Sequence, residues 1–173
     1  ERVRQSEERY RNIVENIEDG YYEIDLTGHP LFCNDAYLKI LGYSRQEWLD
    51  THFTDYIDAE TINRLNSIFM RILQTGMSRS GIEWAFTAKD GQVKNLEETV
   101  SLIKDAKGNP IGFRGLARDV TKRKNHDAMI KHLAYHDFLT GLPNRLLFFD
   151  RIHMALEQAK RNKQSLAVME IDL

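Results

Sequence analysis

This sequence of 173 residues lacks cysteine pairs, long apolar runs and any excess of one charge. The single cysteine, Cys33, excludes an internal disulfide framework and a cysteine-rich zinc site. The longest apolar runs span a few residues, far fewer than the roughly 20 that cross a bilayer. The 24 basic and 26 acidic residues are spread along the chain, so no basic surface is available for a phosphate backbone. These absences predict a cytoplasmic segment that contacts no membrane and binds no nucleic acid.

What is present is a periodic pattern of apolar residues typical of an α+β fold. Alternating or apolar segments bounded by turn residues predict five strands, at residues 21–26, 31–33, 81–89, 93–104 and 111–120. Short helices follow the second strand, and apolar residues at three-and-four spacing predict a longer helix from Asp58 to Gly76. We therefore expect one antiparallel five-stranded sheet with helices on one face, an arrangement that encloses a pocket.

Capping residues mark the short helices. Asn34 or Asp35 is expected to cap a helix that ends at Gly42, and Ser44 a second one, with Glu47 at its third helical position. Ahead of the sheet, residues 1–17 carry an apolar stripe on a charged helix. Such a stripe needs a partner, so we expect this helix to pair with its copy in a homodimer.

The remainder of the chain has a different pattern. A linker helix is expected over residues 122–136, and Gly141 and Pro143 then interrupt the helical pattern. A second helix is expected from Asn144. The apolar run 166–173 predicts a buried strand.

The first part of the chain resembles the PAS family of sensory domains. The resemblance lies in Asn34-Asp35-Ala36-Tyr37, in Gly42-Tyr43-Ser44 followed by Glu47, in Lys89-Asp90-Gly91 and in Asp119-Val120-Thr121. The order and spacing of these pieces agree with the strands and helices expected above. The resemblance implies a PAS domain over about residues 7–121.

A second resemblance begins at Asp137. Residues 137–145, Asp-Phe-Leu-Thr-Gly-Leu-Pro-Asn-Arg, are similar to the signature at the start of GGDEF domains, which make cyclic di-GMP from two GTP molecules. We expect structural roles in turns and caps for the members of this signature, namely Asp137, Thr140, Gly141, Asn144 and Arg145. By the same resemblance, Asp172 and the Leu173 carbonyl would hold magnesium with GTP in an intact domain.

These resemblances imply a domain order: an N-terminal helix at 1–17, a PAS domain at 7–121, a linker helix at 122–136 and a truncated GGDEF domain at 137–173. The guanine-reading residues and the Gly-Gly-Asp/Glu-Glu-Phe turn of that family do not occur in residues 137–173. We therefore expect no catalysis from this piece and a diguanylate cyclase as its parent. A parent with a degenerate GGDEF domain, or with an EAL domain that follows, remains an alternative.

The PAS pocket has aromatic candidates for its lining but no cofactor signature. Haem would need an axial ligand on the helix after Asp58, which has no histidine, and Cys33 is misplaced for a flavin adduct. The candidates are Tyr22, Phe32, Tyr37, Trp48, Phe53, Phe69 and Trp84. These side chains either line a site for a small-molecule signal or fill the core of a ligand-free dimerisation module. A polar group in the pocket without a protein partner would favour the ligand.

Overall fold

The computed structural model describes residues 2–169, and it describes side chains for residue 5 and residues 8–169. Two compact units divide the chain between Lys122 and Arg123. Among the described residues, no helix combines the length and the apolar character that crossing a bilayer requires.

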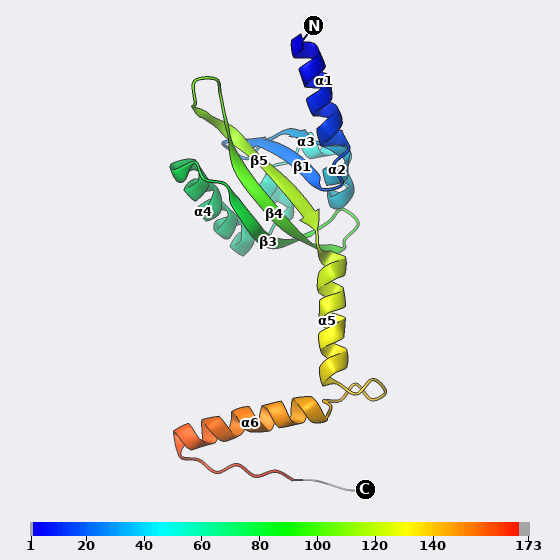
Figure 1. Ribbon diagram of the computed structural model, residues 1–173, viewed down its shortest axis with the longest axis vertical. Helices are drawn as coiled ribbons and strands as arrows, with labels where there is room; N and C mark the ends of the chain where they lie inside the picture. The colour runs from blue at the N-terminus through cyan, green and yellow to red at the C-terminus, as the bar shows by residue number, and fades with distance from the viewer. Residues whose placement is uncertain (1, 170–173) are drawn as a thin grey trace. The chain divides into compact units, whose positions relative to one another are not determined.

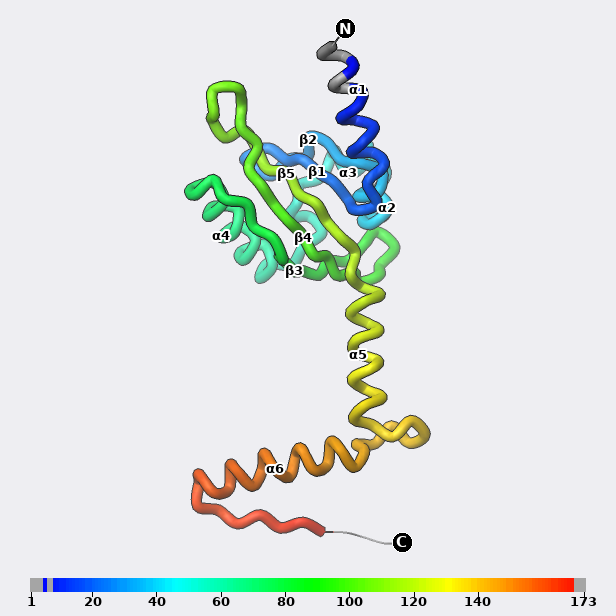
Figure 2. Tube along the Cα trace, in the orientation of Figure 1, coloured from blue at the N-terminus to red at the C-terminus, as the bar shows by residue number. Residues whose placement is uncertain are grey.

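The first unit is built on the predicted five-stranded antiparallel sheet, which the structure confirms (Figure 1). Its order is β2-β1-β5-β4-β3, so the first and last strands of the sequence lie beside each other at the centre. Figure 2 shows β1, in blue, beside β5, in yellow-green. The strands are β1 (Gly20–Asp25), β2 (Pro30–Cys33), β3 (Arg79–Thr87), β4 (Val93–Lys104) and β5 (Pro110–Asp119).

Four helical segments connect β2 to β3, namely α2 (Asp35–Leu41), α3 (Arg45–Leu49), the 3-10 helix η1 (Phe53–Tyr56) and α4 (Ala59–Thr75). The predicted caps are present. The Asn34 side chain accepts from the Tyr37 amide, and Ser44 and Glu47 form a reciprocal capping box. Gly42 ends α2 with a φ of 81°, a conformation that a side chain would strain.

The core lies between the sheet and these helices. Every second residue of β3 and β4 points inward, which buries Trp84 and Phe86 on β3 and Leu96 and Val100 on β4. The helices contribute Tyr37, Leu41, Trp48, Leu65 and Ile72 to the same cluster. Burial of these large apolar side chains is the main source of stability in this unit.

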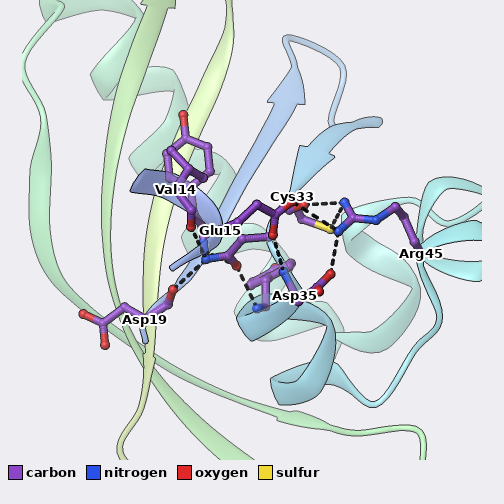
Figure 3. A network of polar contacts seen from close by, with 9 residues as sticks. Val14, Glu15, Asp19, Cys33, Asp35 and Arg45 are labelled. Carbon is purple, nitrogen blue, oxygen red and sulfur yellow. Dashed lines mark hydrogen bonds and ion pairs between the residues drawn. The ribbon is translucent and has the colours of Figure 1, made fainter. Parts of the chain in front are cut away.

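The helix α1 (Arg2–Glu15) joins the sheet through the fully buried side chain of Asn34. The side-chain Nδ2 atom of Asn34 donates to the carbonyls of Val14 and Asp19, both at 3.0 Å, and the side-chain Oδ1 atom accepts from the Tyr21 backbone amide at 2.9 Å. Figure 3 shows Val14 and Asp19 on one side of this network and Cys33 and Arg45 on the other. Other side chains of α1 are less covered, since Tyr10 and Ile13 are 50% and 56% exposed.

The second unit contains most of α5 (Thr121–Tyr135) and all of α6 (Arg145–Asn162). Asn144 caps α6, as the break at Gly141 and Pro143 predicts. The strand predicted at 166–173 is corrected by the structure, because residues 166–169 have no regular secondary structure and are exposed. A strand needs a neighbour for its backbone hydrogen bonds, and the described part of this unit supplies none. Residues 170–173 of that prediction lie outside the described residues.

Candidate functional site

A cavity of about 20 Å³ lies inside the first unit, between the sheet and the helical segments. A single water-sized group needs roughly 10–15 Å³, so the cavity has room for one. Its lining comes from β1, β2, β3, β4, α2, α3, η1 and α4. The cavity is therefore assembled from most of the unit, and a change at its wall reaches several elements at once.

The polar centre of this cavity is Glu98 of β4. Glu98 lies between Leu96 and Val100 on the inward face of the strand and is 2% exposed. The Tyr22 hydroxyl donates to its Oε2 atom at 3.3 Å. Its Oε1 atom has no hydrogen-bond partner among the described residues. A buried polar atom without a partner is rare in folded proteins and indicates a position where another molecule can bind.

Burial decides the protonation of Glu98. It raises the pKa of this carboxyl from 4.5 to about 7, and the nearby Trp84 indole and Tyr22 hydroxyl lower it only in part. Near neutral pH the group therefore exchanges readily between carboxylate and carboxylic acid. Burial also raises the pKa of Tyr22, Tyr37 and Tyr56, so these phenols remain protonated.

Two tryptophans share the cavity wall, and they are the only two in the sequence. Trp48 comes from α3 and Trp84 from β3. Among the described atoms neither indole N–H meets an acceptor in good hydrogen-bond geometry. Each nevertheless has a protein oxygen close by, the Tyr56 hydroxyl for Trp48 and the Glu98 carboxylate for Trp84. The cavity thus contains polar groups whose hydrogen bonding is incomplete.

Ring packing fixes the aromatic side chains of the wall. Tyr37 lies 4.9 Å from Tyr22 and 5.8 Å from Trp48, between ring centroids. Gly115 of β5 makes space for the Tyr22 ring, because a Cβ atom at this position would clash with it. Packing between neighbouring rings and the lack of a side chain at Gly115 thus fix the positions of these aromatic residues.

The structure places six of the seven candidate aromatic residues around this cavity: Tyr22, Tyr37, Trp48, Phe53, Phe69 and Trp84. The expectation for Phe32 is corrected. Phe32 pairs with Glu23 across β1 and β2, whereas Tyr22 pairs with Cys33, so Phe32 lies on the opposite face of the sheet from Tyr22. There it packs edge-to-face against Tyr21.

Sequence reasoning missed Glu98, the residue that gives the cavity its charge. A signal was present, since Leu96, Glu98 and Val100 alternate with more polar positions along one strand. A glutamate on the apolar face of such a strand marks a buried acid. Its neighbour Glu97 faces the other way, where it pairs in register with Arg118.

In the second unit, the GGDEF-like signature forms a tight turn between α5 and α6. Asp137 Oδ1 accepts from the Thr140 amide at 2.9 Å and from its hydroxyl at 2.8 Å, and Gly141 has a φ of 69°. Asn144 caps α6 and also donates to the Ala134 carbonyl at 2.8 Å, while Arg145 lies over the ring of Phe149. The side chains of the signature thus stabilise the backbone of the turn and pack against a neighbouring ring, as expected for structural roles. The expected metal ligands, Asp172 and Leu173, lie outside the described residues.

Two family models match the chain. The model described as the PAS fold matches residues 8–120, and the model described as the diguanylate cyclase GGDEF domain matches residues 134–173. Among solved structures, a PAS domain from Colwellia psychrerythraea is 20% identical, with a TM-score of 0.62 over 67% of this chain and 98% of that domain. A domain of a sensory box histidine kinase/response regulator from Geobacter sulfurreducens is 24% identical, with a TM-score of 0.57 over 68% of this chain and 96% of that domain. Both show the fold of the first unit.

Curated relatives include enzymes. A diguanylate cyclase from Vibrio cholerae is 24% identical over 147 residues, which cover 84% of this chain and 46% of the relative. The diguanylate cyclase TpbB from Pseudomonas aeruginosa is 43% identical over 49 residues, 28% of this chain and 11% of TpbB. The chain thus spans less than half the length of either relative.

Proposed function

Because the chain belongs to the PAS family and continues into a segment that matches the GGDEF domain, we propose that it is the sensory and coupling part of a diguanylate cyclase. The PAS unit binds a small molecule and thereby sets the rate at which the parent protein makes cyclic di-GMP. The observation that supports sensing is the unpaired Oε1 atom of Glu98 inside the cavity. An apolar core that only fills space would have no reason to bury this atom.

The strand that carries Glu98 also holds the start of α5. Three residues before Glu98, the Asn95 amide donates to the Thr121 hydroxyl at 2.8 Å, and the Asn95 carbonyl accepts from the Val120 amide at 2.9 Å. A ligand that moves Glu98 displaces β4, and with it the first residues of α5. This gives a continuous covalent and hydrogen-bonded route from the cavity to the linker helix.

In the parent protein, the step under control would be the association of two GGDEF domains. Each would hold one GTP with magnesium, and the 3′-hydroxyl of one GTP would attack the α-phosphate of the other. Catalysis then depends on the two domains facing each other. A helix that changes its angle or register at Thr121 would therefore control the rate.

A second candidate function is dimerisation without a ligand. The exposed Tyr10 and Ile13 side chains of α1 favour it, because they form an apolar surface that a second copy of α1 could cover. The two functions are compatible, since a dimer is also needed for the proposed meeting of GGDEF domains.

Native mass spectrometry of the purified chain and assay of the parent protein test the sensor. A reproducible added mass that is present in wild type, absent in Glu98→Gln and kept in Glu97→Gln supports binding at the cavity. In the parent, Glu98→Gln should change the rate of cyclic di-GMP synthesis and Glu97→Gln should not. A chain without added mass, together with a parent whose rate is unaffected by Glu98→Gln, would contradict the sensor and leave dimerisation as the function.

A further inference from the structure

The carboxylate in the cavity has no countercharge. The groups near Glu98 are the Tyr22 hydroxyl from β1 and the Trp84 indole from β3, and both are neutral. No Lys, Arg or His lines the cavity among the residues that the structure describes. A buried carboxylate is unfavourable unless a cation compensates it. When Glu98 is ionised, the complement that the cavity lacks is therefore a positive charge.

The rest of the wall suits a cation equally well. Seven of the twelve lining residues are aromatic, Tyr56 in addition to the six named above. Their rings meet at different angles, 33° between Tyr22 and Tyr37 and 80° between Tyr37 and Trp48, so they do not form one parallel stack. Aromatic faces attract ammonium groups through the ring quadrupole, and this attraction strengthens where water is excluded.

The size of the cavity limits what can lie beside Glu98. About 20 Å³ accommodates a group as large as water or an ammonium head, but not an organic molecule of several carbons. A second pocket of about 340 Å³ shares Ile24, Phe53 and Phe69 with the cavity, so these side chains form the wall between the two spaces. The rings of Phe53 and Phe69 meet edge-to-face, 5.7 Å apart between centroids.

The outer pocket is mostly apolar. Beyond the shared wall it is lined by Leu26, Gly28, Met70, Leu73 and Phe113, with Asp25, Thr27 and Asn66 as its polar members. Phe53 and Phe69 are side chains that can change rotamer without breaking a hydrogen bond, because they have none to break. A short alkyl chain would therefore fit the outer pocket while its polar head reaches the inner one.

From the uncompensated carboxylate, the aromatic wall and the apolar outer pocket, we infer that the ligand is a small primary amine. It binds as the ammonium ion beside Glu98, and its alkyl chain passes between Phe53 and Phe69 into the outer pocket. This inference rests on the proposed function, in that the PAS unit binds a small molecule, and names the class of that molecule. An ammonium ion supplies no acceptor to the indole N–H groups, and the oxygens close to them belong to the protein, namely the Tyr56 hydroxyl for Trp48 and the Glu98 carboxylate for Trp84.

The test uses three probes of similar size and different charge: propylammonium, propionamide and propionate. Both tryptophans of the chain line the cavity, so tryptophan fluorescence of the full chain reports binding there directly. Propylammonium is expected to change the fluorescence in a saturable way, and the neutral and anionic probes are not. Its affinity should fall about tenfold or more as the pH is lowered from about 8 to about 5, because protons then compete for Glu98.

Two variants of β4 distinguish the face of the strand that lines the cavity from its opposite face. Glu98→Gln keeps the shape of the side chain and should weaken propylammonium binding at least about tenfold, whereas Glu97→Gln on the opposite face should bind like wild type. If Glu98→Gln does not fold, the pH dependence of propylammonium binding to the wild-type protein still tests whether Glu98 binds the amine. Binding of propionamide instead of propylammonium would overturn the amine and leave the sensor intact. Absence of binding by all three probes would also overturn it, and the cyclase assay of Glu98→Gln in the parent would then decide the sensor separately.

Discussion

The two units of this chain contain similar apolar stripes but bury them differently. In the first unit, the apolar faces of the sheet and the helices cover each other and form one core. In the second unit, no residue among 123–169 is buried, and Phe138 and Leu139 of the turn are 87% and 81% exposed. Periodicity therefore predicts that a face is apolar, but a covering partner is what turns that face into stability.

The sharpest test of this comparison is one substitution made in both units. Leu41→Ala removes a side chain that is fully buried, so we expect the free energy of unfolding to fall by about 4 kcal/mol. Leu139→Ala removes an exposed side chain and should change it by less than about 0.5 kcal/mol. Urea unfolding followed by circular dichroism measures both. A similar loss for the two variants would break the comparison and show that Leu139 is covered in solution.

The second prediction compares two carboxyl groups whose pKa values are shifted in opposite directions. The pKa of Glu98 is raised to about 7 by burial, whereas hydrogen bonds from Thr140 lower the pKa of the exposed Asp137. For Glu98, the unfolded chain releases its proton near pH 4.5 but the folded protein keeps it until about pH 7. The free energy of unfolding should therefore fall as pH rises through this window, by about 3 kcal/mol in total, and level off above it.

Glu98→Gln should remove this slope, because glutamine does not titrate. The measurement is urea unfolding at a series of pH values for wild type and variant, and the difference between the two curves isolates Glu98. The sign for Asp137 is the reverse, since a lowered pKa favours the folded state above the ordinary pKa and that contribution disappears as pH falls. Identical pH profiles for wild type and Glu98→Gln would show that Glu98 is hydrated in solution.

The third prediction compares two helix caps. Asn34 is buried and makes four hydrogen bonds, so Asn34→Ala should reduce the free energy of unfolding by about 2 kcal/mol. Asn144 caps α6 in an exposed position, and Asn144→Ala should cost about 1 kcal/mol or less. Thermal melts of both variants against wild type measure the difference. Equal effects would mean that burial adds nothing to the value of a cap.

These caps also show what the sequence could reveal. Asn34 or Asp35, Ser44 and Asp58 were identifiable as helix starts, and Gly42 and Gly76 as helix ends, because capping depends on residues within one turn of the chain. The five strands were identifiable for a similar reason, since alternation is local. The fold of the first unit therefore followed from short-range patterns that agree with one another.

Features that depend on register or on a partner were not identifiable in the same way. Phe32 belongs to a strand of four residues, too short for alternation to decide its face, and pairing with Glu23 decides it. Alternation with Leu96 and Val100 could assign Glu98 rather than Glu97 to the apolar face, but its contact with Tyr22 of β1 depends on how the strands assemble. For the run 166–169, apolar character alone predicted a strand that requires a neighbour to form.

The pairing of β1 with β5 has a consequence for protein engineering. Gly20 lies opposite Ala117, and the flanking residues Asp19 and Arg118 form an ion pair at 2.7 Å. The chain therefore enters and leaves this sheet at adjacent points. A domain with adjacent ends can be inserted into a surface loop of an unrelated protein at a small cost in loop-closure entropy. The strand order thus makes the segment from Asp19 to Arg118 suited to insertion into a loop of a host protein, where its two ends would join the host at neighbouring points.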